Sequence, residues 1–129
     1  MKAKLIFNTI LFLALAFTGC EKSGLKCADD PEFCALIGKE EYTKTGPIID
    51  KYLSGLDKNL SAEDKLNLLS DWLTCKSCVS GAEILCNSCI YTLPAQSELR
   101  IWFSVNGKTT EKTLDILMAD PLRFSGFHN

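Results

Sequence analysis

Residues 99–118 read LRIWFSV, then NG, then KTTEKTLDILM, and this stretch decides the fold. In residues 99–105 the side chains alternate between an apolar and a more polar set, as in a strand with one buried face. Asn-Gly between two strand-like runs is the strongest short-range signal for a β-hairpin, because both residues tolerate positive φ angles. The stretch therefore predicts two antiparallel strands that meet at Asn106-Gly107, the second running over residues 108–118.

A two-residue loop also fixes how the two strands pair, since the turn sets their register. It predicts three cross-strand pairs, Leu99 with Leu114, Ile101 with Lys112 and Phe103 with Thr110. Trp102 falls on the opposite face from these apolar side chains. Two interpretations of Trp102 stay open: a helix or the C-terminal tail covers it, or it is an exposed aromatic contact for a partner.

The sequence on either side of the hairpin completes a small sheet. Residues 82–92 predict a preceding strand, with a break near Asn87-Ser88. Asp120-Pro121 is expected to end the last strand. Phe124 and Phe127 in the tail are expected to pack back on the domain. The sheet predicted from these signals is a three-stranded antiparallel meander.

Three helical segments precede this sheet. Proline at position 31 and Gly38 predict a first short helix between them. Residues 39–46 are expected to form a polar loop, and a second helix opens at Pro47. A capping pattern at Ser61 starts a third helix, which ends near Cys75. The periodicity assigns the buried faces of the last two helices to Ile48, Ile49, Tyr52, Leu53 and Leu56, and to Leu66, Leu68, Leu69, Trp72 and Leu73. The predicted class is α+β, with two or three N-terminal helices packed on the meander in a single domain over residues 27–129.

Residues 1–19 are typical of an export signal. Lys2 and Lys4 precede an apolar run that is shorter than the roughly 20 residues of a membrane-spanning helix, and small residues end it. Loss of this segment leaves 12 basic and 16 acidic residues, a formal charge of −4. Because no basic patch is present, the composition argues against nucleic acid as a partner.

The stretch Phe17-Thr18-Gly19-Cys20 resembles the lipobox of bacterial lipoproteins. The resemblance implies a diacylglycerol on the Cys20 thiol, cleavage before Cys20, and acylation of the new amine with chains such as palmitate. Two or three chains should hold the domain at a membrane, since one chain alone binds only marginally. Residues 20–26 are then the lipidated cysteine and a polar tether. Glu21, in place of the aspartate that retains such proteins in the inner membrane, favours the outer membrane. The mature domain resembles no characterised family.

Ordinary secretion is the alternative to lipidation, because Ala14-Leu15-Ala16 matches an A-x-A cleavage site. The chain has seven cysteines, an odd number. Lipidation of Cys20 leaves an even set in which every thiol can find a partner, and the cysteine count therefore favours it.

The remaining cysteines are Cys27, Cys34, Cys75, Cys78, Cys86 and Cys89, and the last four form two CxxC motifs. We interpret all six as candidates for structural disulfides, because exported proteins fold in an oxidising compartment and small domains gain from cross-links. Spacing alone allows 15 arrangements of six cysteines. The pairing expected from the local sequence is Cys27–Cys34, Cys75–Cys89 and Cys78–Cys86.

Two other interpretations of the CxxC motifs stay open. Four thiolates can hold zinc or an iron–sulfur cluster, although the seven residues between these motifs fall short of the usual 15–20. Thiol–disulfide exchange needs a cysteine with a lowered pKa, typically at a helix N-terminus. Cys75 instead follows a predicted helix.

No set of residues that would carry out a reaction is found, so neither enzymatic activity nor a cofactor is expected. His128 is the only histidine, and a penultimate residue is usually mobile. The acidic pairs Asp29-Asp30, Glu40-Glu41 and Asp115/Asp120 are interpreted as a helix start, a solvated loop and a strand end.

The sequence thus predicts a lipid-anchored protein of the cell envelope that acts as a non-enzymatic binding or structural module. Its partner would be another envelope protein or an envelope polymer, in addition to the membrane. The alternative is an envelope thiol-redox or metal-handling protein, with zinc as its metal, that uses Cys75, Cys78, Cys86 and Cys89.

Overall fold

The computed structural model describes residues 31–89 and 95–129. The predicted export signal, Cys20, the tether and Cys27 lie outside these residues, as does the predicted end of the first strand. Within the described residues no helix is both long and apolar enough to cross a membrane. In chain order the elements are α2 (Pro31–Gly38), the 3-10 helix η2 (Tyr42–Thr45), α3 (Gly46–Ser54), α4 (Ala62–Thr74), β1 (Val79–Cys89), β2 (Gln96–Val105), β3 (Lys108–Leu117) and β4 (Arg123–His128).

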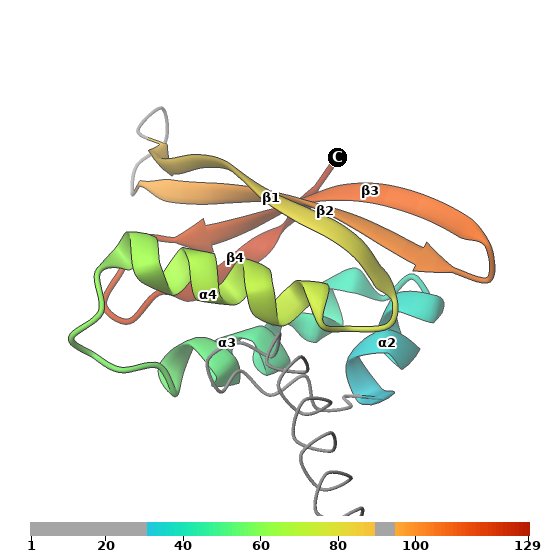
Figure 1. The fold of residues 1–129 in the computed structure, drawn as a ribbon, viewed down its shortest axis with the longest axis horizontal. Coiled ribbons are helices and arrows are strands. Elements are labelled where there is room, and N and C mark those ends of the chain that lie inside the picture. Colours follow the sequence, from blue (N-terminus) through green and yellow to red (C-terminus); the bar gives the residue numbers. More distant parts are fainter. Residues whose placement is uncertain (1–30, 90–94) are drawn as a thin grey trace, which may run out of the picture.

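The four strands form one antiparallel sheet in the order β1-β2-β3-β4, and the helices pack against one of its faces (Figure 1). The predicted α+β class is confirmed, whereas the prediction of three strands is wrong. The C-terminal tail adds β4, which pairs with β3 through partners such as Leu114 and Phe127. The Phe124 amide also donates a 2.7 Å hydrogen bond to the Asp50 carboxylate of α3. The tail is therefore held by the sheet and by a helix at the same time.

The hairpin has the register predicted from its loop. Leu99, Ile101 and Phe103 pair with Leu114, Lys112 and Thr110, in that order. Asn106 and Gly107 have φ angles of 52° and 78°, in the left-handed region that this turn requires. Because side chains alternate along a strand, this register sends Leu99, Ile101 and Phe103 to the helix-covered face, where all three are buried.

Strand β1 differs from its predicted bounds at the N-terminal end. It begins at Val79 rather than residue 82, because Val79 pairs with Phe103 and is buried against the core. The expected break near Asn87-Ser88 corresponds to irregular pairing on both sides of Cys86. The strand therefore leaves the end of α4 almost directly.

The segment before α3 corrects a second expectation. Residues 42–45, predicted as part of a polar loop, form η2, and Thr45 is fully buried. The Thr45 hydroxyl donates a 2.7 Å hydrogen bond to the Tyr42 carbonyl, which satisfies the polar group locally. The Tyr42 ring lies 5.4 Å from that of Phe103, so this turn closes one end of the core.

Helices α3 and α4 bury the faces that their periodicity predicts. The Ser61 hydroxyl caps α4 by accepting a 3.1 Å hydrogen bond from the Asp64 amide. The predicted packing of the two tail phenylalanines is also confirmed, since both lie against the core. The helix side of the core consists of Phe33, Ile37, Ile49, Leu53, Leu66, Leu69, Trp72 and Leu73.

Tyr52 and Trp72 join α3 to α4 through stacked rings 4.4 Å apart. The Tyr52 hydroxyl donates a 3.2 Å hydrogen bond to the Leu68 carbonyl. Burial, and next the negative charge of Asp71, raise the pKa of Tyr52 above its ordinary value of 10.0. The phenol therefore keeps the proton that it donates. The Lys76 ammonium lies over the Trp72 ring, 4.0 Å from its centre.

Candidate functional site on the open face of the sheet

The open face is the side of the sheet that points away from α2, α3 and α4. Its side chains alternate with the buried set along each strand, and cross-strand partners share the face. The register pairs Glu83 with Arg100 and Trp102 with Glu111, and it pairs Glu98 with Asp115. Among the described residues, the charged and aromatic side chains of the open face are thus those of Glu83, Glu98, Arg100, Trp102, Glu111, Asp115, Arg123 and His128, and Ser104 and Thr113 also lie on it.

Trp102 lies at the centre of a polar group on this face. Its indole Nε1 donates to Glu111 Oε1 at 3.3 Å. The guanidinium of Arg100 lies 3.4 Å from a Glu83 carboxylate oxygen and 3.1 Å from one of Glu111. The Trp102 ring covers Gly81, where an added Cβ would lie 3.2 Å from the ring. A glycine at this position therefore lets the ring approach β1 closely.

The surroundings of Trp102 bear on its two interpretations. The helices pack on the other face, and the tail pairs only with residues 113–117 of β3. In the described part of the chain, Trp102 is partly exposed, with neither a helix nor the tail over it. This placement suits an aromatic contact for a partner.

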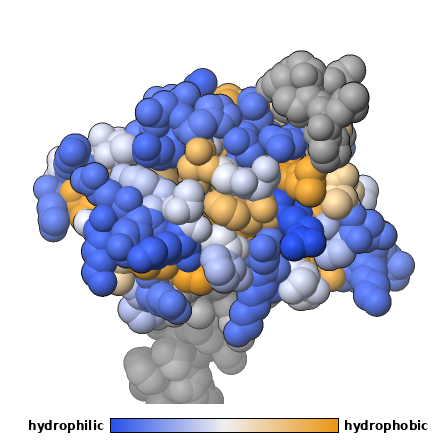
Figure 2. All heavy atoms as spheres, turned by 180° about the vertical axis from the view of Figure 1, so that it is seen from behind, coloured by the Kyte–Doolittle hydropathy of each residue, from blue (hydrophilic) through white to orange (hydrophobic). Residues whose placement is uncertain are grey.

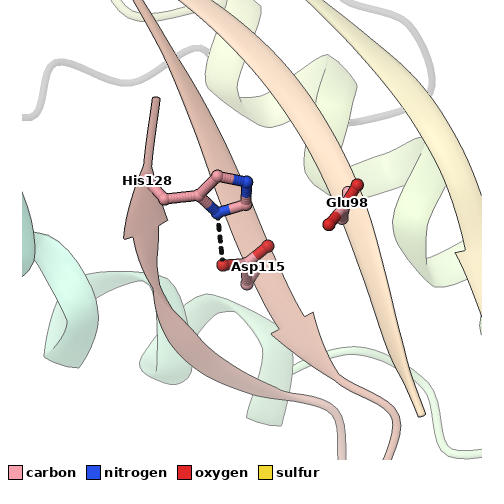
Figure 3. Close-up of side chains that lie close together, drawn as sticks. All are labelled: Glu98, Asp115 and His128. Atoms are coloured by element: carbon pink, nitrogen blue, oxygen red, sulfur yellow. Dashed lines mark hydrogen bonds and ion pairs between the residues drawn. The ribbon is translucent and has the colours of Figure 1, made fainter. Parts of the chain in front are cut away.

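A second group, the Glu98–Asp115–His128 cluster, brings together side chains from β2, β3 and β4 (Figure 3). One ligand atom from each residue lies within 4.8 Å of the other two. His128 Nδ1 is 2.8 Å from Asp115 Oδ2. The Asp115 side chain is 16% exposed and that of His128 is 50% exposed. The cluster therefore has a largely buried carboxylate at its base and an accessible imidazole above it.

The remaining atoms of the cluster have few partners. Within the described residues, Asp115 Oδ1 is buried and accepts no hydrogen bond. Glu98 Oε1 lies 3.7 Å from the sulfur of Cys86, which is part of a disulfide and has no proton to donate. Two carboxylates placed directly opposite each other on neighbouring strands repel. The arrangement consequently favours a positively charged group between them.

The sequence alone does not bring these three residues together. It places Asp115 with Asp120 at a strand end, whereas Asp115 lies inside β3. It predicts a mobile His128, whereas His128 is the last residue of β4 and pairs with Thr113. The hairpin register already implied that Glu98 faces Asp115, because it places their neighbours Leu99 and Leu114 together. The missing signal was the fourth strand, which brings His128 to them.

Cys34 and Cys78 each form a disulfide, as expected, but they are bonded to each other, with Cα atoms 5.6 Å apart. The predicted pairs Cys27–Cys34 and Cys78–Cys86 are therefore wrong. Spacing in sequence favoured local bridges, whereas α2 packs beside the junction of α4 and β1, which brings two distant cysteines together. Cys75 is also part of a disulfide, and so is Cys86. Cys27 and the side chain of Cys89 lie outside what the structure describes, so the Cys75–Cys89 pair stays a prediction.

The Cys34–Cys78 disulfide bears on the other interpretations of the CxxC motifs. A four-thiolate metal site needs the Cys78 sulfur as a thiolate, and in this structure that sulfur is bonded to Cys34. Redox catalysis by a CxxC motif needs its two cysteines to pair with each other, which Cys78 does not do with Cys75. Cys78 is also only 5% exposed, which shields its sulfur from an attacking thiolate.

Comparison with other proteins adds no assignment to this geometry. No protein-family model matches the chain. Searches of curated proteins and of solved structures likewise gave no match.

Proposed function

We propose that the protein is a non-enzymatic binding module of the bacterial cell envelope, anchored by lipid on Cys20, which holds another envelope protein against its open face. The observation that carries the proposal is the position of Trp102, partly exposed beside Arg100 on a face that the described helices leave uncovered. Tryptophan and arginine are among the residues that contribute most binding energy at protein interfaces.

The charge of the open face supports a protein with a basic surface as the partner. The face holds four carboxylates, those of Glu83, Glu98, Glu111 and Asp115, and among its described residues the basic side chains are those of Arg100 and, on β4, Arg123, so the carboxylates outnumber the arginines. An anionic envelope polymer would be repelled by this surface, whereas a basic protein surface complements it.

The hydropathy of the surface supports a transient partner rather than an obligate subunit. Figure 2 shows the back of the molecule, where hydrophilic residues cover most of the surface and hydrophobic residues form small patches between them. Among the described residues, Leu85 is the most exposed large hydrophobic side chain, and it is only 38% exposed. Obligate interfaces are more apolar than this.

The lipobox-like stretch before Cys20 supports the anchor. Helix α2 begins at Pro31, so residues 21–30 join the proposed anchor to the fold. Fully extended, these residues span at most about 35 Å. The domain would therefore act close to the membrane surface, on partners that are themselves at that membrane.

Photocrosslinking in the native host tests the proposed binding face. A photoreactive residue at Ser104, beside Trp102, is expected to give a discrete protein adduct, and one at Glu63 on α4 is the control that should not. Trp102→Ala should decrease the adduct at least about tenfold, as expected for a residue at the energetic centre of an interface. Equal adducts from both positions, or an adduct insensitive to Trp102→Ala in a variant that melts like the parent, would count against the proposal.

Intact mass spectrometry tests the anchor separately. The protein purified from host membranes is expected to begin at Cys20 and to carry acyl chains, since two or more chains make dissociation negligible. Cys20→Ser should move the protein from the membrane to the soluble fraction. A chain that begins at Phe17 with an unmodified thiol on Cys20 would instead support ordinary secretion.

A further inference from the structure

We propose that Glu98, Asp115 and His128 bind a divalent transition-metal ion of the zinc type on the open face of the sheet. The proposal does not depend on the partner proposed above, because it rests on the geometry of the Glu98–Asp115–His128 cluster alone. It also uses no cysteine, so it differs from the thiolate site considered from the sequence.

The distances suit a metal with small changes of side-chain torsion. The three candidate ligand atoms lie within 4.8 Å of one another. In a tetrahedral zinc site with bonds of about 2.1 Å, ligand atoms lie roughly 3.4 Å apart. The backbones that carry the three residues belong to paired strands of one sheet. The side chains at the surface of the cluster, above all the half-exposed His128, can therefore close on an ion while the strands stay in place.

The charges of the cluster favour a cation. Glu98 and Asp115 are direct cross-strand partners, and no lysine or arginine in the described ranges forms an ion pair with either. Asp115 Oδ1 is buried without a hydrogen-bond donor among the described residues. A dication bound between the carboxylates would remove their repulsion and give the buried oxygen a partner.

The chemistry of the donors selects the class of metal. Imidazole nitrogen favours zinc, copper, nickel and iron, whereas magnesium and calcium prefer oxygen ligands alone. Three protein ligands leave a coordination position for water or for a group of a bound partner.

Access to the cluster is open on the side of β4. The residue opposite Asp115 on this strand is Gly126, which has no side chain to cover the carboxylate. A Cβ placed on Gly126 would meet no atom within 4 Å, and its φ angle of 156° favours glycine. An ion can therefore approach Asp115 from solvent.

Isothermal titration calorimetry with Zn²⁺ alone, on the full chain without a histidine tag, tests the proposal. One equivalent is expected to bind. Glu98→Gln, Asp115→Asn and His128→Gln should each weaken the affinity at least about tenfold, because each removes a ligand. Glu83→Gln is the matched control, since it also removes one carboxylate from the open face, and should change the affinity less than threefold. Mg²⁺ should bind far more weakly.

Nuclear magnetic resonance gives a second readout that does not depend on affinity. His128 is the only histidine of the chain, so its imidazole nitrogens give one unambiguous set of signals. Saturating Zn²⁺ should change the chemical shift of the imidazole nitrogen that coordinates the metal. This change is expected in the parent and in Glu83→Gln.

Three results would overturn the site. The first is no heat and no imidazole shift at millimolar Zn²⁺. The second is binding that survives His128→Gln. The third is binding that His128→Gln abolishes while Glu98→Gln and Asp115→Asn leave it unchanged. That last result would mean that zinc binds to His128 alone. Asp115 and His128 would then form only an ion pair that holds β4 on the sheet.

Discussion

Replacement of Cys34 and Cys78 together by alanine is expected to lower the free energy of unfolding by about 4 kcal/mol, because their disulfide closes a loop over 44 residues. A cross-link of that span removes much of the conformational freedom of the unfolded chain. For a domain of this size, the loss corresponds to a melting temperature lower by roughly 15 to 30 °C. Urea denaturation followed by tryptophan fluorescence measures the change.

Ser77→Ala is the matched control for this variant. The Ser77 hydroxyl lies 3.7 Å from the Cys34 sulfur and is exposed, so its loss should cost less than about 1 kcal/mol. The double alanine variant removes both thiols and cannot form wrong pairs through them. If its free energy of unfolding were within about 1 kcal/mol of that of the parent, the disulfide would not be the main interaction that holds α2 on the domain.

Phe103→Ala is expected to destabilise the domain by about 3–5 kcal/mol, as is typical of a buried phenylalanine replaced by alanine. Phe103 is 1% exposed and lies on β2, between the first residue of β1 and Thr110 of β3. Its ring centre is 5.4 Å from that of Tyr42 and 6.0 Å from that of Phe127. The change therefore removes contacts with η2 and β4 together, the two segments that the sequence did not predict.

The neighbouring residue provides the control for Phe103. Ser104 is partly exposed on the open face, and Ser104→Ala should change the free energy of unfolding by less than about 1 kcal/mol. The two tryptophans, Trp72 in α4 and Trp102 in β2, report from opposite sides of the sheet. A Phe103→Ala variant as stable as the parent would mean that η2 and β4 do not depend on this ring for their packing.

Local signals were enough to predict the hairpin and the helices. Asn106-Gly107 sets a loop length, a loop length sets a register, and the register sets which side chains are buried. The Ser61 cap and the apolar faces of α3 and α4 likewise depend on residues within a few positions of one another. These elements could be predicted because the residues that decide them are neighbours in sequence.

Features that depend on distant contacts were missed. Strand β4 has six residues with a glycine among them, and it forms because β3 offers an edge and Asp50 offers an acceptor. The Cys34–Cys78 bridge depends on where α2 packs, which no spacing of cysteines encodes. The Glu98–Asp115–His128 cluster needs both the hairpin register and the unexpected strand, so the pairing of Glu98 with Asp115 could be predicted and the position of His128 could not.

The Cys34–Cys78 bridge also decides how the domain responds to mechanical load. A pulling force that enters from the N-terminal side of α2 reaches Cys34 and passes through the covalent bond to Cys78. Helices α3 and α4 lie between these residues in the chain and are bypassed. The 44-residue separation corresponds to about 150 Å of extended chain that cannot be drawn out while the bond is intact. Tension is delivered instead to the start of β1, so the sheet bears it and the helical half does not unravel.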